Sequence, residues 1–141
     1  MKNKGLRRCT ISQWTCIEIQ LTDESCLMEA LKELGYNPEM HKEGISLSRG
    51  RGQCHMKIPN DQIAKVSGGY AYGDIEFEKT ETGWKIHGDN SSVSRFSPNK
   101  LKQIYSERRL MKTIAQTGNY AMESRSVGQK GEIRLRLVEV G

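Results

Sequence analysis

The sequence predicts an α+β fold, an antiparallel sheet of about six strands with two helices on one face. The main observation is that a strand-like and then a helix-like pattern occurs twice, each followed by further strand-like segments. The strand-like runs are residues 14–21 and 83–87, and the helix-like runs are 23–34 and 97–116. This doubled strand–helix–strand–strand order predicts an internal repeat of ferredoxin-like or TBP-like type.

The first strand and helix show the two periods clearly. Ile17, Ile19 and Leu21 alternate with Glu18 and Gln20, which predicts one buried and one solvated face. The helix is expected to start at Thr22 or Asp23 as its cap, and its apolar stripe consists of Leu27, Ala30, Leu31 and Leu34. Gly35 is suited to the position after the last helical turn.

Two further strands are predicted before the midpoint of the chain. Residues 36–44 are expected to form a short edge strand that contains Met40, and the polar, glycine-rich residues 45–52 a hairpin loop. Residues 53–58 alternate again, and Cys54, Met56 and Ile58 share the buried face.

The second half contains two predicted hairpins separated by a helix. Residues 74–79 and 84–86 form the first hairpin around a turn at Glu81, Thr82 and Gly83. The helix at 97–116 is expected to start at Ser97-Pro98, where a good cap precedes a favoured first helical residue. The closing hairpin comprises residues 120–126 and 132–140 with a turn at 128–131. Its predicted inner row is Ile133, Leu135 and Leu137, and its outer row is Arg134 and Arg136.

Length and composition predict a single α+β domain over residues 11–141, preceded by a basic arm at residues 1–10. The chain has 141 residues, 35% of them hydrophobic, and a formal net charge of +5. This charge favours acidic partners such as nucleic acid, an acidic protein surface or anionic lipid. No apolar run approaches the roughly 18 residues of a membrane span, so the expectation is a cytoplasmic protein without membrane contact.

The sequence predicts no catalytic constellation, no cofactor and no metal site. Cys54 and His55 are adjacent on a strand and therefore point to opposite faces, so Cys54 is predicted to be a buried core thiol. Nucleotide-binding glycine motifs and paired metal-ligand spacings are both missing. A metal site would have to draw its ligands from Cys9, Cys16, Cys26, His41, Cys54, His55 and His87. Of these, Cys9, Cys16 and Cys26 could still converge through the fold.

The basic residues are the strongest candidates for contacts with phosphates or an acidic partner. Several of them fall on the polar side of the second helix, and others lie in the predicted loop at 45–52 and in the N-terminal arm. The candidate set is Arg7, Arg8, Arg49, Arg51, Lys102, Arg108, Arg109 and Lys112. A merely solvated basic helix is the competing interpretation, because no known nucleic-acid-binding motif accompanies these residues.

Six segments together resemble a known family, and they occur in its order and spacing. They are residues 11–20, 26–36, 72–77 with 83–87, 100–105 and 131–137. The chain is similar to a domain-of-unknown-function family that includes a small hypothetical protein of chloroplast and cyanobacterial genomes. The resemblance covers residues 11–140 and implies an intracellular accessory protein, in the plastid stroma for plastid relatives. It also implies an association with AAA-type ATPases, and it brings no catalytic residue.

The functional prediction is therefore a non-catalytic binding or adaptor protein that acts through protein contacts. Its expected partner is another protein or a second copy of this chain. An AAA-type ATPase is one such candidate partner. The alternative is a nucleic-acid-binding accessory protein that uses the basic helix and the N-terminal arm.

Overall fold

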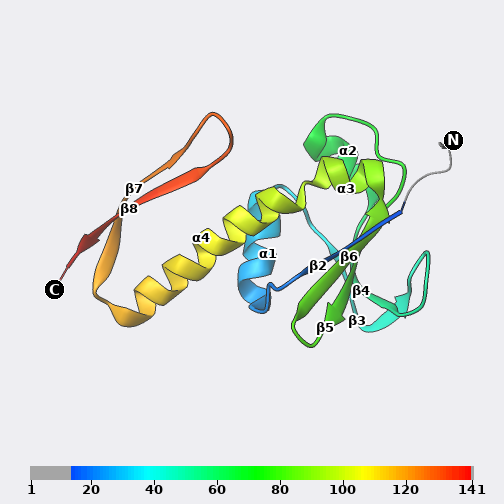
Figure 1. Ribbon diagram of the computed structural model, residues 1–141, viewed down its shortest axis with the longest axis horizontal. Helices are drawn as coiled ribbons and strands as arrows, with labels where there is room; N and C mark the ends of the chain where they lie inside the picture. The colour runs from blue at the N-terminus through cyan, green and yellow to red at the C-terminus, as the bar shows by residue number, and fades with distance from the viewer. Residues whose placement is uncertain (1–13, 141) are drawn as a thin grey trace, which may run out of the picture. The chain divides into compact units, whose positions relative to one another are not determined.

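The computed structural model describes residues 14–140, which form two compact units (Figure 1). The first unit comprises residues 14–22 and 35–97, and the second comprises residues 23–34 and 98–140. The basic arm at residues 1–10, with the candidates Arg7 and Arg8, lies outside the described residues.

The first unit contains a five-stranded antiparallel sheet in the order β2-β6-β5-β4-β3. The unit contains five strands and two helices. The strands are β2 (Trp14–Ile19), β3 (Glu39–Ser46), β4 (Gln53–Ile58), β5 (Ile75–Thr80) and β6 (Gly83–Asp89), and the helices are α2 (Asn60–Ser67) and α3 (Asn90–Phe96). The predicted strand at 53–58 and the predicted edge position of Met40 are confirmed.

The core of this unit is built on the apolar face of the sheet. Met56 is paired with Phe77 and Phe77 with Ile86, so these three buried side chains lie in one row across β4, β5 and β6. The centre of the Phe77 ring lies 5.9 Å from the centre of the Phe96 ring and 6.1 Å from that of Trp84, and both pairs are nearly edge-on. Aromatic packing on Phe77 therefore joins α3 to the centre of the sheet.

Two helices of the first unit were not predicted. α2 follows Pro59 and buries only Ile63, so its apolar stripe is too weak to be recognised from periodicity. α3 is capped by Asp89, whose side chain accepts a hydrogen bond from the Ser91 backbone N–H at 2.9 Å. The predicted helix at 97–116 begins at Pro98, because Ser97 takes a left-handed conformation with φ of 57° and ends α3.

The second unit consists of α1 (Glu24–Glu33), α4 (Pro98–Thr117) and the hairpin of β7 (Tyr120–Val127) and β8 (Ile133–Glu139). Asp23 caps α1, as one of the two predicted caps, by accepting the Cys26 backbone N–H at 3.0 Å. α1 packs against α4, and the buried residues of the two helices are Cys26, Leu27, Ala30, Leu31, Leu101, Ile104, Tyr105, Glu107 and Ile114.

The α+β class and the antiparallel pairing are confirmed. The predicted six-stranded sheet is in fact a five-stranded sheet plus a separate two-stranded one, because β7 and β8 pair only with each other within residues 14–140. The second predicted strand–helix–strand–strand unit contains an additional helix, α3, between β6 and α4, and residues 14–140 do not show a ferredoxin-like topology. The placement of two helices on one face of the sheet stays a prediction.

Candidate protein-binding surface

The β7–β8 hairpin closes through a short turn at residues 128–132. The Gly128 backbone N–H donates to the Glu132 carbonyl at 2.7 Å, and the Gly131 N–H donates to the Gly128 carbonyl at 3.0 Å. Gly131 has φ of 83°, a conformation that residues with a β-carbon adopt at a cost. At the open end the Val140 N–H donates to the Asn119 carbonyl at 2.9 Å, so the pairing extends along the whole hairpin.

Apolar side chains remain exposed along this hairpin. Val127 is 57% exposed, and every residue of β7 is exposed to solvent. The other large apolar residues exposed in the hairpin and just beyond it are Tyr120, Met122, Val138 and Val140. Since exposed apolar residues gathered on one element commonly mark interaction sites, the hairpin is the leading candidate for a binding surface.

Among residues 14–140, no strand pairs with the outer edge of β8. In an antiparallel pair, residues that exchange hydrogen bonds with the partner strand alternate with residues whose N–H and C=O point away from it. The bond from Gly128 to Glu132 fixes this alternation for β7 and β8. Consequently the backbone N–H and C=O groups of Arg134 and Arg136 point toward β7. The backbone groups of Ile133, Leu135 and Leu137 point away from β7, toward the open edge.

A groove of about 430 Å³ lies between α4 and β8 within the second unit. Its apolar lining comes from Leu110, Ile133 and Leu135, and its polar lining residues are Lys102, Gln103, Ser106, Glu107 and Glu132. Leu110 is 42% exposed. The inner face of β8 is therefore only partly covered by the helix.

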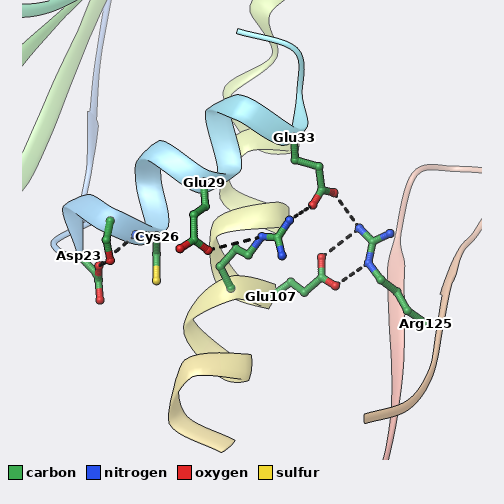
Figure 2. A network of polar contacts seen from close by, with 8 residues as sticks. Asp23, Cys26, Glu29, Glu33, Glu107 and Arg125 are labelled. Carbon is green, nitrogen blue, oxygen red and sulfur yellow. Dashed lines mark hydrogen bonds and ion pairs between the residues drawn. The ribbon is translucent and has the colours of Figure 1, made fainter. Parts of the chain in front are cut away.

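Arg125 attaches the hairpin to both helices of the second unit (Figure 2). Its guanidinium donates to Glu107 of α4, through Nη2 to Oε1 at 3.0 Å, and to Glu33 of α1, through Nη2 to Oε2 at 2.9 Å. The Glu107 side chain is 6% exposed and that of Arg125 is 32% exposed. The hydrogen bond to Glu107, together with the charges of Glu107 and Glu33, raises the pKa of Arg125.

Further ion pairs join α1 to α4. Lys112 Nζ lies 2.6 Å and Arg109 Nη1 lies 3.1 Å from Asp23 Oδ2, and Arg108 bonds Glu33. The hydrogen bond from Lys112, with those from the Cys26 N–H and the Ser25 hydroxyl, holds the pKa of Asp23 well below its usual range. The same bond raises the pKa of Lys112. These basic residues thus hold two helices together.

The structure brings only some of the predicted contact residues together. Arg108, Arg109 and Lys112 gather on α4, where each pairs with a carboxylate of residues 23–33, and Lys102 lines the groove beside β8. Arg49 and Arg51 belong to the first unit, in the loop between β3 and β4, and the Arg49 guanidinium lies 5.1 Å from the centre of the Trp14 ring.

The cysteine and histidine candidates lie mainly in the first unit. Cys54 is fully buried, as predicted, and burial raises the pKa of its thiol. Cys16 is exposed and lies opposite His87 in the strand register, and His87 Nε2 is 3.0 Å from Glu78 Oε1. His55 Nδ1 accepts the Lys79 backbone N–H at 3.0 Å. No group of three or more metal-ligating side chains suited to a metal ion occurs among residues 14–140.

The residues that attach the hairpin were not predicted as part of a site. Arg125 lies on β7 and its partners lie in two helices far away in sequence, so no local pattern reveals the cluster. One signal was present, because Glu107 is the one acid in the otherwise basic helix from Pro98 to Thr117. A buried acid on such a helix requires a basic partner from another element.

Comparisons with known protein families, with curated proteins and with solved structures find no match. Within residues 14–140, no helix has the length and apolar character needed to traverse a lipid bilayer.

Proposed function

We propose that this protein is a protein-binding adaptor and that the β7–β8 hairpin is its binding surface. The observation that carries the proposal is that, within residues 14–140, this hairpin pairs with no other strand and keeps apolar side chains in solvent. A lone two-stranded hairpin is marginally stable in water unless it packs on other elements. A protein partner would cover its open edge and its apolar residues.

The attachment of the hairpin supports this proposal. Arg125 bonds to both Glu33 and Glu107, so β7 is fixed on a pair of packed helices close to the turn of the hairpin. Binding costs less free energy when the binding element is already held in place. A fixed hairpin with uncovered strands is suited to presenting a surface to another protein.

The edge strand β3 of the first unit is a weaker candidate. Met40 is 43% exposed there and Ile45 is 38% exposed. However, the register of β3 shifts between these two residues, and Glu39, Lys42 and Glu43 place charges along the strand. Irregular register and charged side chains are the usual protection of an edge strand against pairing.

A capture experiment tests the adaptor proposal. We expect the full-length chain, used as bait in a lysate, to retain a specific protein, and Met122→Glu with Val127→Asp to reduce that capture at least about tenfold. The matched control is Gln129→Glu, which adds the same kind of charge in the turn of the same hairpin. Because both altered apolar residues are exposed, folding should be preserved in the variants.

Light scattering after size exclusion gives the oligomeric state in the same series. A second copy as partner would appear as a dimer that the Met122→Glu, Val127→Asp variant dissociates and Gln129→Glu preserves. The proposal is wrong if the chain is monomeric and recovers no protein, or if all three chains recover the same proteins equally. An AAA-type ATPase stays a proposal for the captured partner, resting on the family resemblance alone.

Nucleic-acid binding is the alternative proposal, and the distribution of charge makes it the weaker one. The four basic residues Lys2, Lys4, Arg7 and Arg8 lie before residue 14, and residues 14–140 carry 18 basic against 17 acidic side chains. On α4, Arg108, Arg109 and Lys112 are already paired with carboxylates. Binding to generic RNA or DNA that weakens steeply between about 50 and 200 mM salt would favour this alternative.

A further inference from the structure

We infer that the partner adds a strand to the outer edge of β8, and that the added segment alternates apolar and acidic residues. This inference rests on the proposed protein-binding function and specifies the chemistry of the partner. It combines three features of the second unit, namely an open backbone edge, an incompletely covered apolar row and two exposed arginines on β8.

The regularity of β8 selects this edge over that of β7. The register of the hairpin shifts at Glu123, so β7 contains an irregularity between Met122 and Ser124, whereas β8 is regular over its seven residues. Bulges disturb the row of hydrogen-bonding groups that a new strand needs. The backbone groups of Ile133, Leu135 and Leu137 form such a row without interruption.

The inner face of β8 determines one half of the sequence pattern of the partner. The side chains of Ile133, Leu135 and Leu137 share this face and are half-buried. Beside them lies the groove with Leu110 of α4 in its lining. Every second side chain of an added strand would point into this groove, and apolar side chains there would fill its space and cover Leu110.

The outer face of β8 determines the other half of the sequence pattern of the partner. Arg134 and Arg136 lie on this face with side chains 74% and 73% exposed. Their present partners are Glu132, at 3.5 Å from Arg134, and Glu123, at 3.4 Å from Arg136. Exposed ion pairs of this length contribute little, so carboxylates on an added strand could contact both arginines as well. Opposite charges directly across two strands stabilise the pairing.

The same charges disfavour a second β8 strand as the occupant. Antiparallel pairing of two β8 strands about a two-fold axis near Arg136 would place arginine opposite arginine, which is destabilising. The added strand is therefore not a second β8. It carries acidic residues at the positions opposite Arg134 and Arg136. An extended acidic–apolar segment of about seven residues matches the length of the edge.

Synthetic peptides test this chemistry on the full-length protein. The probe is a seven-residue peptide that alternates valine and glutamate, and the two controls alternate valine with lysine and serine with glutamate. By fluorescence anisotropy we expect saturable binding of the probe below about 1 mM and at least about tenfold weaker binding of each control. Binding of the probe should weaken with salt, because the ion pairs are solvent-exposed.

Two variants separate strand addition from simple contact with the side chains. Leu135→Pro removes an outward-facing N–H without removing a bond to β7, and Leu135→Ala shortens the same side chain and keeps that N–H. We expect at least about tenfold weaker probe binding for Leu135→Pro than for Leu135→Ala. Circular dichroism should show the same fold in both.

Three outcomes overturn the inference: no probe binding at about 1 mM, equal binding of the valine–lysine peptide, or equal affinities of the two Leu135 variants. The inference also fails if Leu135→Pro dissociates a dimer of this chain, because the occupant would then be a second copy. If a protein is still captured through the hairpin in any of these cases, the adaptor proposal stands and only the partner chemistry is wrong.

Discussion

Replacing Phe77 by alanine is expected to lower the free energy of unfolding of the first unit by about 3–5 kcal/mol. Phe77 is fully buried at the centre of the sheet, and its ring contacts those of Trp84 and Phe96. Removing it leaves a cavity where β5, β6 and α3 meet. Domains of this size are stable by about 5–15 kcal/mol, so the loss would be a large part of the total.

Urea unfolding followed by tryptophan fluorescence measures this effect. Tyr72→Ala is the matched control, because it also removes an aromatic ring but from a side chain that is 71% exposed. We expect the control to change stability by no more than about 0.5–1 kcal/mol. Equal losses in the two variants would show that Phe77 is not at the centre of the core.

Replacing Glu107 by alanine is expected to destabilise the second unit by about 1–3 kcal/mol. Removing one partner of a buried ion pair costs about 3–5 kcal/mol, but Arg125 is about one-third exposed and keeps Glu33, which reduces the effect. The physical reason is that Arg125 loses the two charge-assisted hydrogen bonds that hold β7 on α4 near the turn of the hairpin. The backbone amides of β7 should also exchange faster in the Glu107→Ala variant than in the native protein.

Glu123→Ala is the control for this experiment. Glu123 forms one ion pair with Arg136 on the solvent-exposed side of the hairpin. Such pairs contribute about 0–1 kcal/mol, so the stability of the second unit should barely change. If Glu107→Ala behaves like this control in both stability and exchange, the attachment through Arg125 does not hold the hairpin.

The sequence predicted the elements with regular periodicity well. The alternation of Cys54, Met56 and Ile58 located β4, and the alternation of Ile133, Leu135 and Leu137 placed arginines on the outer face of β8. Each of these strands has one face that is more buried than the other, fully in β4 and partly in β8, and period-two patterns report this difference.

Other features could not be predicted from local patterns. α2 buries one residue, Ile63, and so lacks a helical stripe. The separation of β7 and β8 from the main sheet depends on strand pairing between distant residues, which periodicity does not encode. The cluster of Glu33, Glu107 and Arg125 likewise joins three distant segments.

The predicted basic surface illustrates the same limit. Arg108, Arg109 and Lys112 were correctly placed on the polar side of a helix, but their partners on and just before α1 depend on how two helices pack. An unpaired basic helix and one that forms ion pairs with a neighbour have the same sequence pattern. The interpretation as a phosphate-binding face therefore loses most of its support once α1 is in place.

Residue-resolved amide exchange of the free protein tests the central claim most directly. If the β8 edge is open, the amides of Leu135 and Leu137 should exchange at rates near those of an unfolded chain, while those of Arg134 and Arg136 are at least about tenfold slower. Adding the valine–glutamate peptide or the captured protein should then slow Leu135 and Leu137. Protection of all four amides in the free monomer, or no slowing when a partner is bound, would contradict the account.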